Sequence, residues 1–243
     1  MKLVVVSAHY PPDFVSGGTL VPQRTSRELR YRGVDTHVYA GWLGADRRPL
    51  EAWDESDETG LPLRWIAIRP FIDWSETANF SNPGVTADFA EYLDRLQPDI
   101  VHFHSLQTLG AGLVHAAADR GLRVVITLHD FWWWCARQFL CDRDYRPCSL
   151  VVNASACECQ VDRRWLDERS AVTLPALARA DRLVAVSEIS SRVAIANGAD
   201  PDRLVVIENG VVAGDAGATA RPTSDANGIL RLVYAGGPDR MKG

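Results

Sequence analysis

Short apolar runs alternate with helical stretches along most of this 243-residue chain, and this alternation constrains the fold more than any other feature. The first run, residues 3–7 (LVVVS), is a continuous β-branched segment, which is typical of a strand buried on both faces. Gly33 and Gly121 each follow a helical stretch, at a position where helices commonly end. The rhythm predicts an α/β fold with a doubly wound parallel sheet, which is Rossmann-like.

The predicted elements can be assigned to residue ranges. Residues 46–60 are acidic and aperiodic, so we expect a surface excursion there. Pro175 lies inside a helical stretch, where it predicts a kink. The predicted strands cover residues 3–7, 34–40, 63–69, 99–103, 123–128, 181–186 and 203–207, and the predicted helices cover residues 19–32, 88–96, 106–120, 163–180 and 188–197.

Composition and charge limit the classes of function. With 47% apolar and 23% charged residues, the chain can bury the core of a globular protein. The formal net charge is −5 and the two signs are interspersed, so nucleic acid, which needs a basic face, is not an expected partner. Met1 is followed at once by Lys2 and a strand-like run, without a secretory leader, and no apolar stretch reaches membrane-spanning length. We expect a cytoplasmic protein. Peripheral association of this protein with the inner face of the membrane is one option.

The composition changes near the C-terminus. Residues 213–228 are rich in Ala, Gly, Thr, Ser, Asp and Pro, which predicts a linker. Residues 229–235 (ILRLVYA) then start a new strand, only a few residues before the sequence ends. We therefore expect one domain at 1–212 and, at 229–243, the start of a second domain that is truncated.

Ligands bind beyond the carboxyl ends of the strands in such sheets, so the residues after each strand carry the most information. Gly17 and Gly18 precede the first helix, where free N–H groups favour a phosphate, although a simple turn would look the same. The chain has no GxGxxG fingerprint, so a dinucleotide site is not supported.

Histidines follow two neighbouring strands. His104 and Ser105 come after residues 99–103, and His102 shares the strand face of His104 by alternation. His129 and Asp130 follow residues 123–128, and such a pair can place an imidazole in a cleft with a carboxylate to orient it. A capping or core histidine is the alternative.

Further polar and aromatic residues follow the same strand ends. Trp132 belongs to the run at 131–134, and aromatic faces stack on sugar rings but more often fill cores, so we expect a mixed role with at least one ring inside. Ser187 and Glu188 follow residues 181–186 and could line the cleft, although capping of the next helix is favoured.

Several motifs together resemble glycosyltransferase family 4, which has the GT-B architecture. They occur in the same order as in that family and span nearly the whole chain. They are YPPDFVSGG (10–18), DIVHFHS (99–105), VVITLHDFWWWC (124–135), ADRLVAVSE (180–188) and DRLVVIENGV (202–211), followed by LVYAGGPDRMKG (232–243), which resembles the start of the family's second domain.

The resemblance implies a retaining hexosyltransferase with two Rossmann-like domains, of which this chain is the N-terminal, acceptor-side half. Its co-substrate would be a UDP- or GDP-sugar, its acceptor a glycan, a lipid-linked molecule or a small molecule, and its catalysis would need no metal. Gly17, Gly18 and Lys242 would lie near the donor diphosphate, and His129 by the transferred sugar. Gly237 stands where the family often has an arginine, and this weakens the expected binding of the donor diphosphate. Without the C-terminal domain, the fragment is expected to fold but not to transfer sugar.

All five cysteines lie between Cys135 and Cys159, which suggests a local staple. A C-x-C pair with two more distant cysteines can form a tetrahedral thiolate site, although the spacing departs from C-x₂-C knuckles. Free or disulfide-linked thiols that brace a long loop are the alternative. Cys141 is left out because similar sequences vary at that position, and the predicted structural zinc ligands are Cys135, Cys148, Cys157 and Cys159.

Other functions fit the sequence less well. The D-x-D at residues 142–144 resembles a metal–nucleotide signature, but it lies in the cysteine loop and not after a strand. A zinc-dependent sugar deacetylase would use residues near His9 and Asp13 together with His102, His104 and His129, but the adjacent aspartates of that class are missing. A non-catalytic half that binds a sugar or a partner chain is the third possibility.

Overall fold

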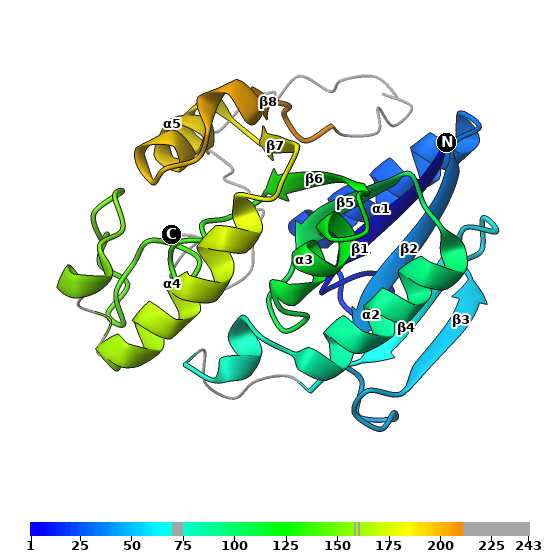
Figure 1. The fold of residues 1–243 in the computed structure, drawn as a ribbon, viewed down its shortest axis with the longest axis horizontal. Helices are drawn as coiled ribbons and strands as arrows, with labels where there is room; N and C mark the ends of the chain where they lie inside the picture. The colour runs from blue at the N-terminus through cyan, green and yellow to red at the C-terminus, as the bar shows by residue number, and fades with distance from the viewer. Residues whose placement is uncertain (70–74, 158, 160, 211–243) are drawn as a thin grey trace, which may run out of the picture.

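The structure is a computed structural model that describes residues 1–69, 75–157, 159 and 161–210. An eight-stranded sheet has the order β3-β4-β2-β1-β5-β6-β7-β8, and all neighbouring strands are parallel except β3 and β4 (Figure 1). The predicted doubly wound α/β fold is therefore confirmed. The strands are β1 (Lys2–Ser7), β2 (Asp35–Trp42), β3 (Ala52–Ser56), β4 (Pro62–Ala67), β5 (Ile100–Ser105), β6 (Arg123–Leu128), β7 (Arg182–Ala185) and β8 (Leu204–Val206).

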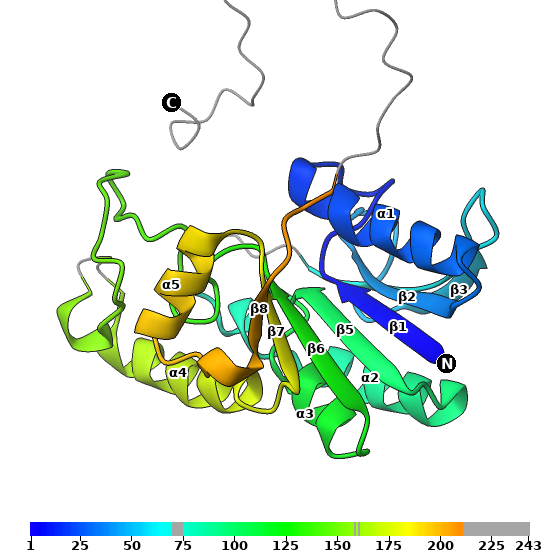
Figure 2. The same ribbon diagram turned by 90° about the horizontal axis from the view of Figure 1, so that it is seen from above.

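Helices cover both faces of the sheet. Figure 2 shows α1 on one side and α2, α3 and α4 on the other, and Ala194 of α5 packs into the same core as the latter three. The α-helices are α1 (Gly17–Tyr31), α2 (Pro83–Leu96), α3 (Gly112–Ala118), α4 (Arg163–Leu177) and α5 (Glu188–Ala196), and short 3₁₀ helices occur at Thr77–Asn79, Ala154–Ala156 and Pro201–Arg203. The predicted linker and second domain, with Lys242, lie outside the described residues.

The first strand is buried on both faces, as its apolar run predicts. Val4 and Val6 point into the core beneath α2 to α4, whereas Leu3 and Val5 join a second core that contains Leu29 of α1. Each such side chain contributes about 1.5–3 kcal/mol of hydrophobic stabilisation when it is fully buried. β1 thus ties the two layers together, and it pairs with both β2 and β5.

The predicted surface excursion at 46–60 contains a strand that the sequence did not indicate. Residues Ala52–Ser56 form β3, an antiparallel edge strand against β4. Trp53 stacks on Trp65 with ring centroids 6.3 Å apart, and Trp65 Nε1 donates to Glu55 Oε1 at 2.6 Å. The strand depends on these cross-strand contacts, and its polar, short sequence has no apolar alternation that could reveal it.

Two helices differ from their predicted bounds because of local backbone chemistry. α2 begins at Pro83, earlier than residue 88, since Asn82 caps it and proline suits the first turn. α3 begins only at Gly112, because Thr108 and Gly110 have φ angles of 73° and 94° that no helix contains. A Cβ at Gly110 would also come within 2.8 Å of the Asn82 nitrogen, so this turn requires glycine. Pro175 lies within the last turn of α4, which ends two residues later.

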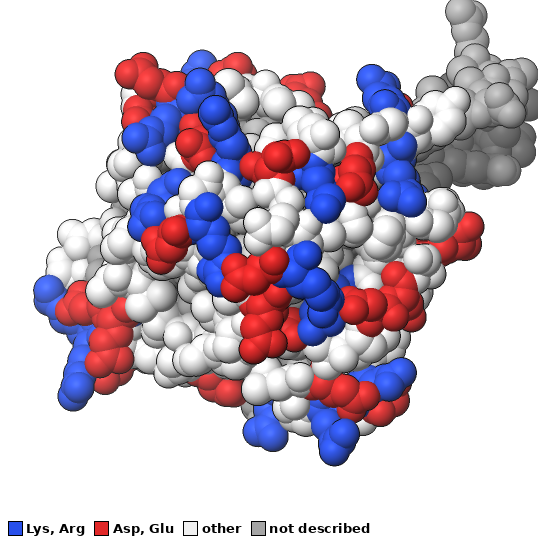
Figure 3. All heavy atoms as spheres, turned by 45° about the vertical axis from the view of Figure 1, so that its right-hand side comes forward, with Lys and Arg blue, Asp and Glu red and all other residues white. Residues whose placement is uncertain are grey.

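Charges of both signs alternate over the face seen in Figure 3, as the sequence suggests. Within the described ranges, none of the helices has the length and apolar character needed to cross a bilayer.

Asp88 links α2 to the sheet. It accepts hydrogen bonds from Tyr39 Oη at 2.9 Å and from Arg64 Nε at 3.1 Å, and its side chain is 17% exposed. We expect Asp88→Ala to lower the free energy of unfolding by about 2–3 kcal/mol, because it removes the carboxylate that accepts from a buried phenol and leaves the half-buried guanidinium of Arg64 with Asp54 alone. Urea denaturation measures this change.

Asp94→Ala is the matched control, because Asp94 lies on the same helix and pairs with Arg120 while 59% exposed. An exposed pair is worth less than about 1 kcal/mol. Equal losses for the two variants would contradict the assigned role of Asp88.

Candidate functional site

The candidate site lies at the carboxyl edge of the sheet, where β1, β5 and β6 end side by side. The loop after β1 is joined to β5 there, since the Ala8 N–H donates to the Ser105 carbonyl at 2.8 Å. Neighbouring strands lie about 4.8 Å apart, so the ends of β1 and β6 are separated by about 10 Å. The residues that follow these strands therefore meet at one rim.

α1 begins at this rim with two exposed glycines, Gly17 and Gly18. Ser16 caps the helix by a reciprocal arrangement, in which Ser16 Oγ accepts from the Thr19 N–H at 3.3 Å and Thr19 Oγ1 accepts from the Ser16 N–H at 2.8 Å. Both glycines are exposed, and a Cβ added to Gly17 would meet nothing within 4 Å. The fold does not require glycine here, so what the two glycines provide is open backbone at a helix N-terminus.

Three histidines form a continuous ladder from the sheet to the rim. His102 Nε2 lies 2.8 Å from Thr127 Oγ1, and His104 Nδ1 lies 2.8 Å from His129 Nε2. The ring centroids are 4.2 Å apart for His102 and His104, and 5.1 Å apart for His104 and His129. His104 is buried, with no partner for Nε2 in the described structure, while His129 is only half-buried.

All three imidazoles are neutral at pH 7. Burial lowers the pKa of His129 to about 4, and burial together with the charge of His129 lowers the pKa of His102 to about 4. Burial lowers the pKa of His104 well below its usual value, and the two neighbouring histidines lower it further. The ladder can therefore hold and orient hydrogen bonds, but it does not present a cation.

Asp130 does not serve as the orienting partner that the sequence suggests for His129. Its Oδ1 accepts from the Trp132 backbone N–H at 2.8 Å, and the partner of the His129 ring is His104. Burial raises the pKa of Asp130 to about 6, opposed by the Trp132 N–H and the charge of Arg169. Asp130 thus shapes the turn after β6.

Trp132 is buried on the wall of a small cavity that His104, His129 and Asp130 also line. It is 3% exposed, and its Nε1 donates to Asn79 Oδ1 at 3.0 Å. Trp133 and Trp134 are buried as well, so the expected packing of at least one ring inside is confirmed. An indole this large fills space better than it lines a wet rim.

The other predicted cleft residues stay near the rim. Ser105 is half-buried at the end of β5. Ser187 caps α5, as favoured from the sequence, with its Oγ accepting from the Ser190 N–H at 3.1 Å. Glu188 is exposed in the first turn of that helix.

Sequence reasoning missed Arg169, which holds the tryptophan turn in place. Arg169 is 1% exposed, donates to the Trp132 carbonyl and lies over the Trp132 ring at 5.3 Å from its centroid. Burial lowers its pKa to about 10. Helical periodicity could have found it, because it shares the inward phase of Leu166, Thr173 and Ala176 on α4.

The four predicted zinc ligands, Cys135, Cys148, Cys157 and Cys159, line one cavity of about 270 Å³ between the loop after β6 and α4. In the described part of the chain, no three His, Cys, Asp or Glu side chains are already drawn together closely enough to hold a metal ion. This applies both to the cysteines and to the histidine ladder.

The carboxylates of the two alternative motifs serve their own loops. Asp13 Oδ2 accepts from the Leu43 N–H at 2.7 Å, which fixes the loop after β1. Asp142 Oδ1 accepts from the N–H groups of Asp144 and Arg146, both at 2.8 Å. Neither the deacetylase nor the D-x-D hypothesis gains support from these contacts.

The histidine ladder predicts a loss of stability in acid. An unfolded histidine takes up a proton as the pH falls below 6.5, whereas folded His102 does so only near pH 4. The stability from this group is therefore lost between these values, by up to about 3 kcal/mol. We expect His102→Gln, which retains a partner for Thr127, to reduce the fall in unfolding free energy between pH 7 and pH 4 by that amount.

Chemical denaturation at a series of pH values checks this expectation. His115→Gln on α3 is the control, because His115 lies outside the ladder, and it should keep the wild-type dependence. A His102→Gln variant with an unchanged pH dependence would show that the ladder does not titrate as described.

Comparisons with known proteins agree with this fold. The structure of Anabaena Alr3699/HepE in complex with UDP and glucose is similar with a TM-score of 0.51 and 15% identity, over 87% of this chain and 45% of that one. The UDP-GlcNAc 2-epimerase of Methanocaldococcus jannaschii gives a TM-score of 0.48 and 11% identity, over 86% of this chain and 46% of that one. This chain thus spans less than half the length of either protein.

A search of the curated proteins found no match. The sequence does match the family described as Glycosyltransferase Family 4 over residues 15–213, which is most of the chain and includes both the glycine start of α1 and the histidine ladder. The chain therefore belongs to glycosyltransferase family 4.

Proposed function

We propose that this chain is the acceptor-side half of an enzyme that transfers a hexose from a nucleotide-sugar to an acceptor hydroxyl, with retention at the anomeric carbon. One observation carries the proposal. The exposed N-terminus of α1 and the half-buried His129 lie at the same rim. α1 follows β1 and His129 follows β6, and only β5 lies between these two strands. A phosphate-binding element and a hydrogen-bonding imidazole are what such a transfer needs on this side of a cleft.

The reaction breaks the bond between the anomeric carbon and the diphosphate, and it forms a bond from that carbon to the acceptor oxygen, whose proton passes to the departing diphosphate. Negative charge develops on the departing nucleoside diphosphate. Backbone N–H groups at Gly17 and Gly18 would stabilise that charge more in the transition state than in the ground state. Lys242, outside the described residues, would add an ammonium from the second domain.

His129 would act as a neutral hydrogen-bonding group beside the transferred sugar. The Nε2 atom of His129 forms a hydrogen bond with His104 Nδ1, so the Nδ1 atom of His129 is available to a ligand. A buried orphan N–H is rarer than a buried orphan acceptor, so the unpartnered His104 Nε2 is best assigned without a proton. His104 Nδ1 then donates, and His129 offers an Nδ1–H donor to a sugar or acceptor oxygen.

The nucleotide is proposed to be UDP or GDP. The Anabaena protein, which shares this fold, binds UDP and glucose, and this supports the first of the two. Ser105 and Glu188 are proposed for the acceptor side of the cleft, because they stay near the rim. The acceptor is a glycan, a lipid-linked molecule or a small molecule, and peripheral membrane association would suit the second of these.

Expression of the complete gene product and a screen of nucleotide-sugars test the function. Release of nucleoside diphosphate from one sugar donor, increased by an acceptor, supports the proposal. Binding of a sugar or a partner chain without any turnover would instead favour a non-catalytic role. The 243-residue chain alone should not transfer sugar, because most of the donor-binding groups belong to the second domain.

Replacing His129 tests its role in the complete protein. We expect His129→Ala to lower kcat by about 10²–10³-fold, the usual effect of removing one preorganised hydrogen bond at a reacting centre. Affinity for the nucleoside diphosphate should stay within about twofold of wild type, since that ligand contacts other groups. Steady-state kinetics and calorimetry with UDP or GDP measure the two effects, and an unchanged kcat would contradict the role.

Gly17→Ala separates ligand binding from folding. Because an added Cβ meets nothing, the variant should be as stable as wild type or more stable, by up to about 1 kcal/mol of helix propensity. Donor affinity should fall at least about tenfold, or 1.4 kcal/mol, because the methyl group obstructs close approach to the backbone. Tyr31→Ala, at the other end of α1 and 87% exposed, is the control that should not change donor affinity.

A further inference from the structure

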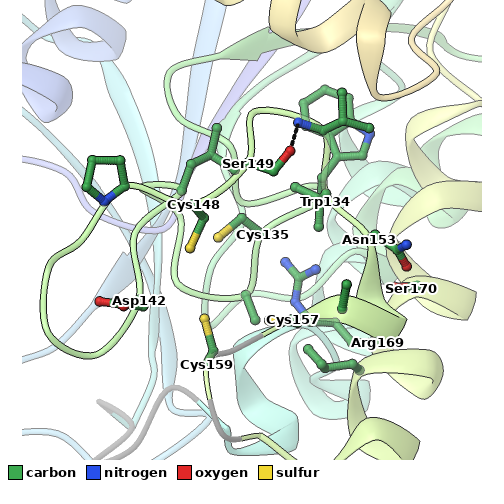
Figure 4. Close-up of a pocket in the computed structure, with 17 residues that line it drawn as sticks. Trp134, Cys135, Asp142, Cys148, Ser149, Asn153, Cys157, Cys159, Arg169 and Ser170 are labelled. Carbon is green, nitrogen blue, oxygen red and sulfur yellow. Dashed lines mark hydrogen bonds between the residues drawn. The ribbon is translucent and has the colours of Figure 1, made fainter.

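Four of the five cysteines line a single cavity that plays no part in the proposed sugar transfer. Figure 4 shows the cavity between the long loop after β6 and the start of α4, with the sulfur atoms of Cys135 and Cys148 pointing toward one another. Cys157 and Cys159 lie on its walls, while Cys141 is not among the lining residues. The structure therefore selects the same four cysteines that the sequence suggested, for an independent reason.

The thiols have the local contacts that zinc-bound thiolates use. The backbone N–H groups of Arg137 and Leu140 donate to the Cys135 sulfur, and the first of these is two residues further along the chain. The Cys159 thiol donates to the Cys141 carbonyl at 4.0 Å. N–H donors that surround sulfur offset the charge of a thiolate.

Arg169 supplies a second, independent observation. Its guanidinium is buried on the wall of the same cavity and donates to two neutral oxygens, the Trp132 carbonyl and Asn79 Oδ1. Among the described residues Arg169 forms no salt bridge, and the more distant charge of Asp130 only partly opposes the lowering of its pKa by burial. A buried cation that is only partly compensated is costly. A tetrathiolate zinc centre carries a net negative charge and would balance this arginine.

We propose that Cys135, Cys148, Cys157 and Cys159 bind one structural Zn²⁺ ion, with Arg169 offsetting the charge of the centre. Each thiol loses its proton on binding, and the metal forms four zinc–sulfur bonds. These bonds are about 2.3 Å long in tetrahedral sites, which brings the sulfurs to ~3.8 Å from one another. The thiols share the cavity but are not yet gathered at such distances. The ion therefore draws the loop closed on binding.

The centre would brace the segment that carries the candidate site. The Cys135 N–H donates to the Phe131 carbonyl at 2.7 Å, so a fixed Cys135 fixes the turn that follows His129 and Asp130. Zinc is here a support for that turn and takes no part in the transfer. A closed, four-thiolate site leaves no open position for substrate.

Metal analysis of the purified complete protein tests the proposal. We expect elemental mass spectrometry to find one zinc ion per chain after purification under reducing conditions without chelator. Serine replacements of Cys135, Cys148, Cys157 or Cys159 should each lower the zinc content at least about tenfold, while Cys141→Ser, the matched control, should keep it. Five reactive thiols without zinc, disulfides among the four cysteines, or equal loss of zinc in Cys141→Ser would each overturn the assignment.

A measurement on the wild-type protein covers the case in which the serine variants do not fold. Removal of the metal with a strong chelator should lower Tm, and Zn²⁺ alone should restore it. Co²⁺ in place of zinc should give the intense visible absorption of a tetrahedral thiolate site. An unchanged Tm after chelator, together with no cobalt absorption, would refute the site. Neither readout depends on sugar transfer, so the outcome is separate from that of the proposed function.

Discussion

The backbone ladder of β1, β5 and β6 is the constraint on which the rest of the molecule depends. β1 is buried on both faces, and β5 and β6 fill one face with apolar side chains, which leaves the strand ends for polar groups. The register aligns those ends, and the loop after β1 is bonded directly to Ser105. The glycine start of α1 and His129 are neighbours because of this ladder, although they are far apart in sequence.

The histidine ladder departs from that rule, and the departure is informative. His102 and His104 occupy strand positions that apolar residues would fill at less cost, and both rings are kept neutral by burial. What they provide is a stacked pair of rings, of which His104 forms the hydrogen bond that fixes the ring of His129. Behind the neighbouring turn, Arg169 and Asn79 do the same for Trp132. The rim is thus held by polar contacts that the core encloses.

Long periodic elements were predictable, and elements that depend on contacts between distant residues were not. The run at 3–7 is a strand buried on both faces, and Gly33 ends α1 with a φ of 86°. β3 escaped prediction because its stability comes from stacking of Trp53 on Trp65, which no local pattern encodes. Asp130 was expected to orient His129, and Trp132 to line the cleft, but the turn after β6 directs the carboxylate to a backbone N–H and the indole nitrogen to Asn79.

The sequence by itself determined the fold class and the placement of Gly17, Gly18, His104 and His129 after neighbouring strands, because strand period, glycine placement and motif order are local properties. Only the tertiary structure decided which groups touch. It paired His129 with His104, moved Trp132 into the core and gathered four of five cysteines around one cavity beside a buried arginine. The physical reason is that hydrogen-bond partners and burial depend on packing between segments distant in the chain, and the order of residues alone does not specify that packing.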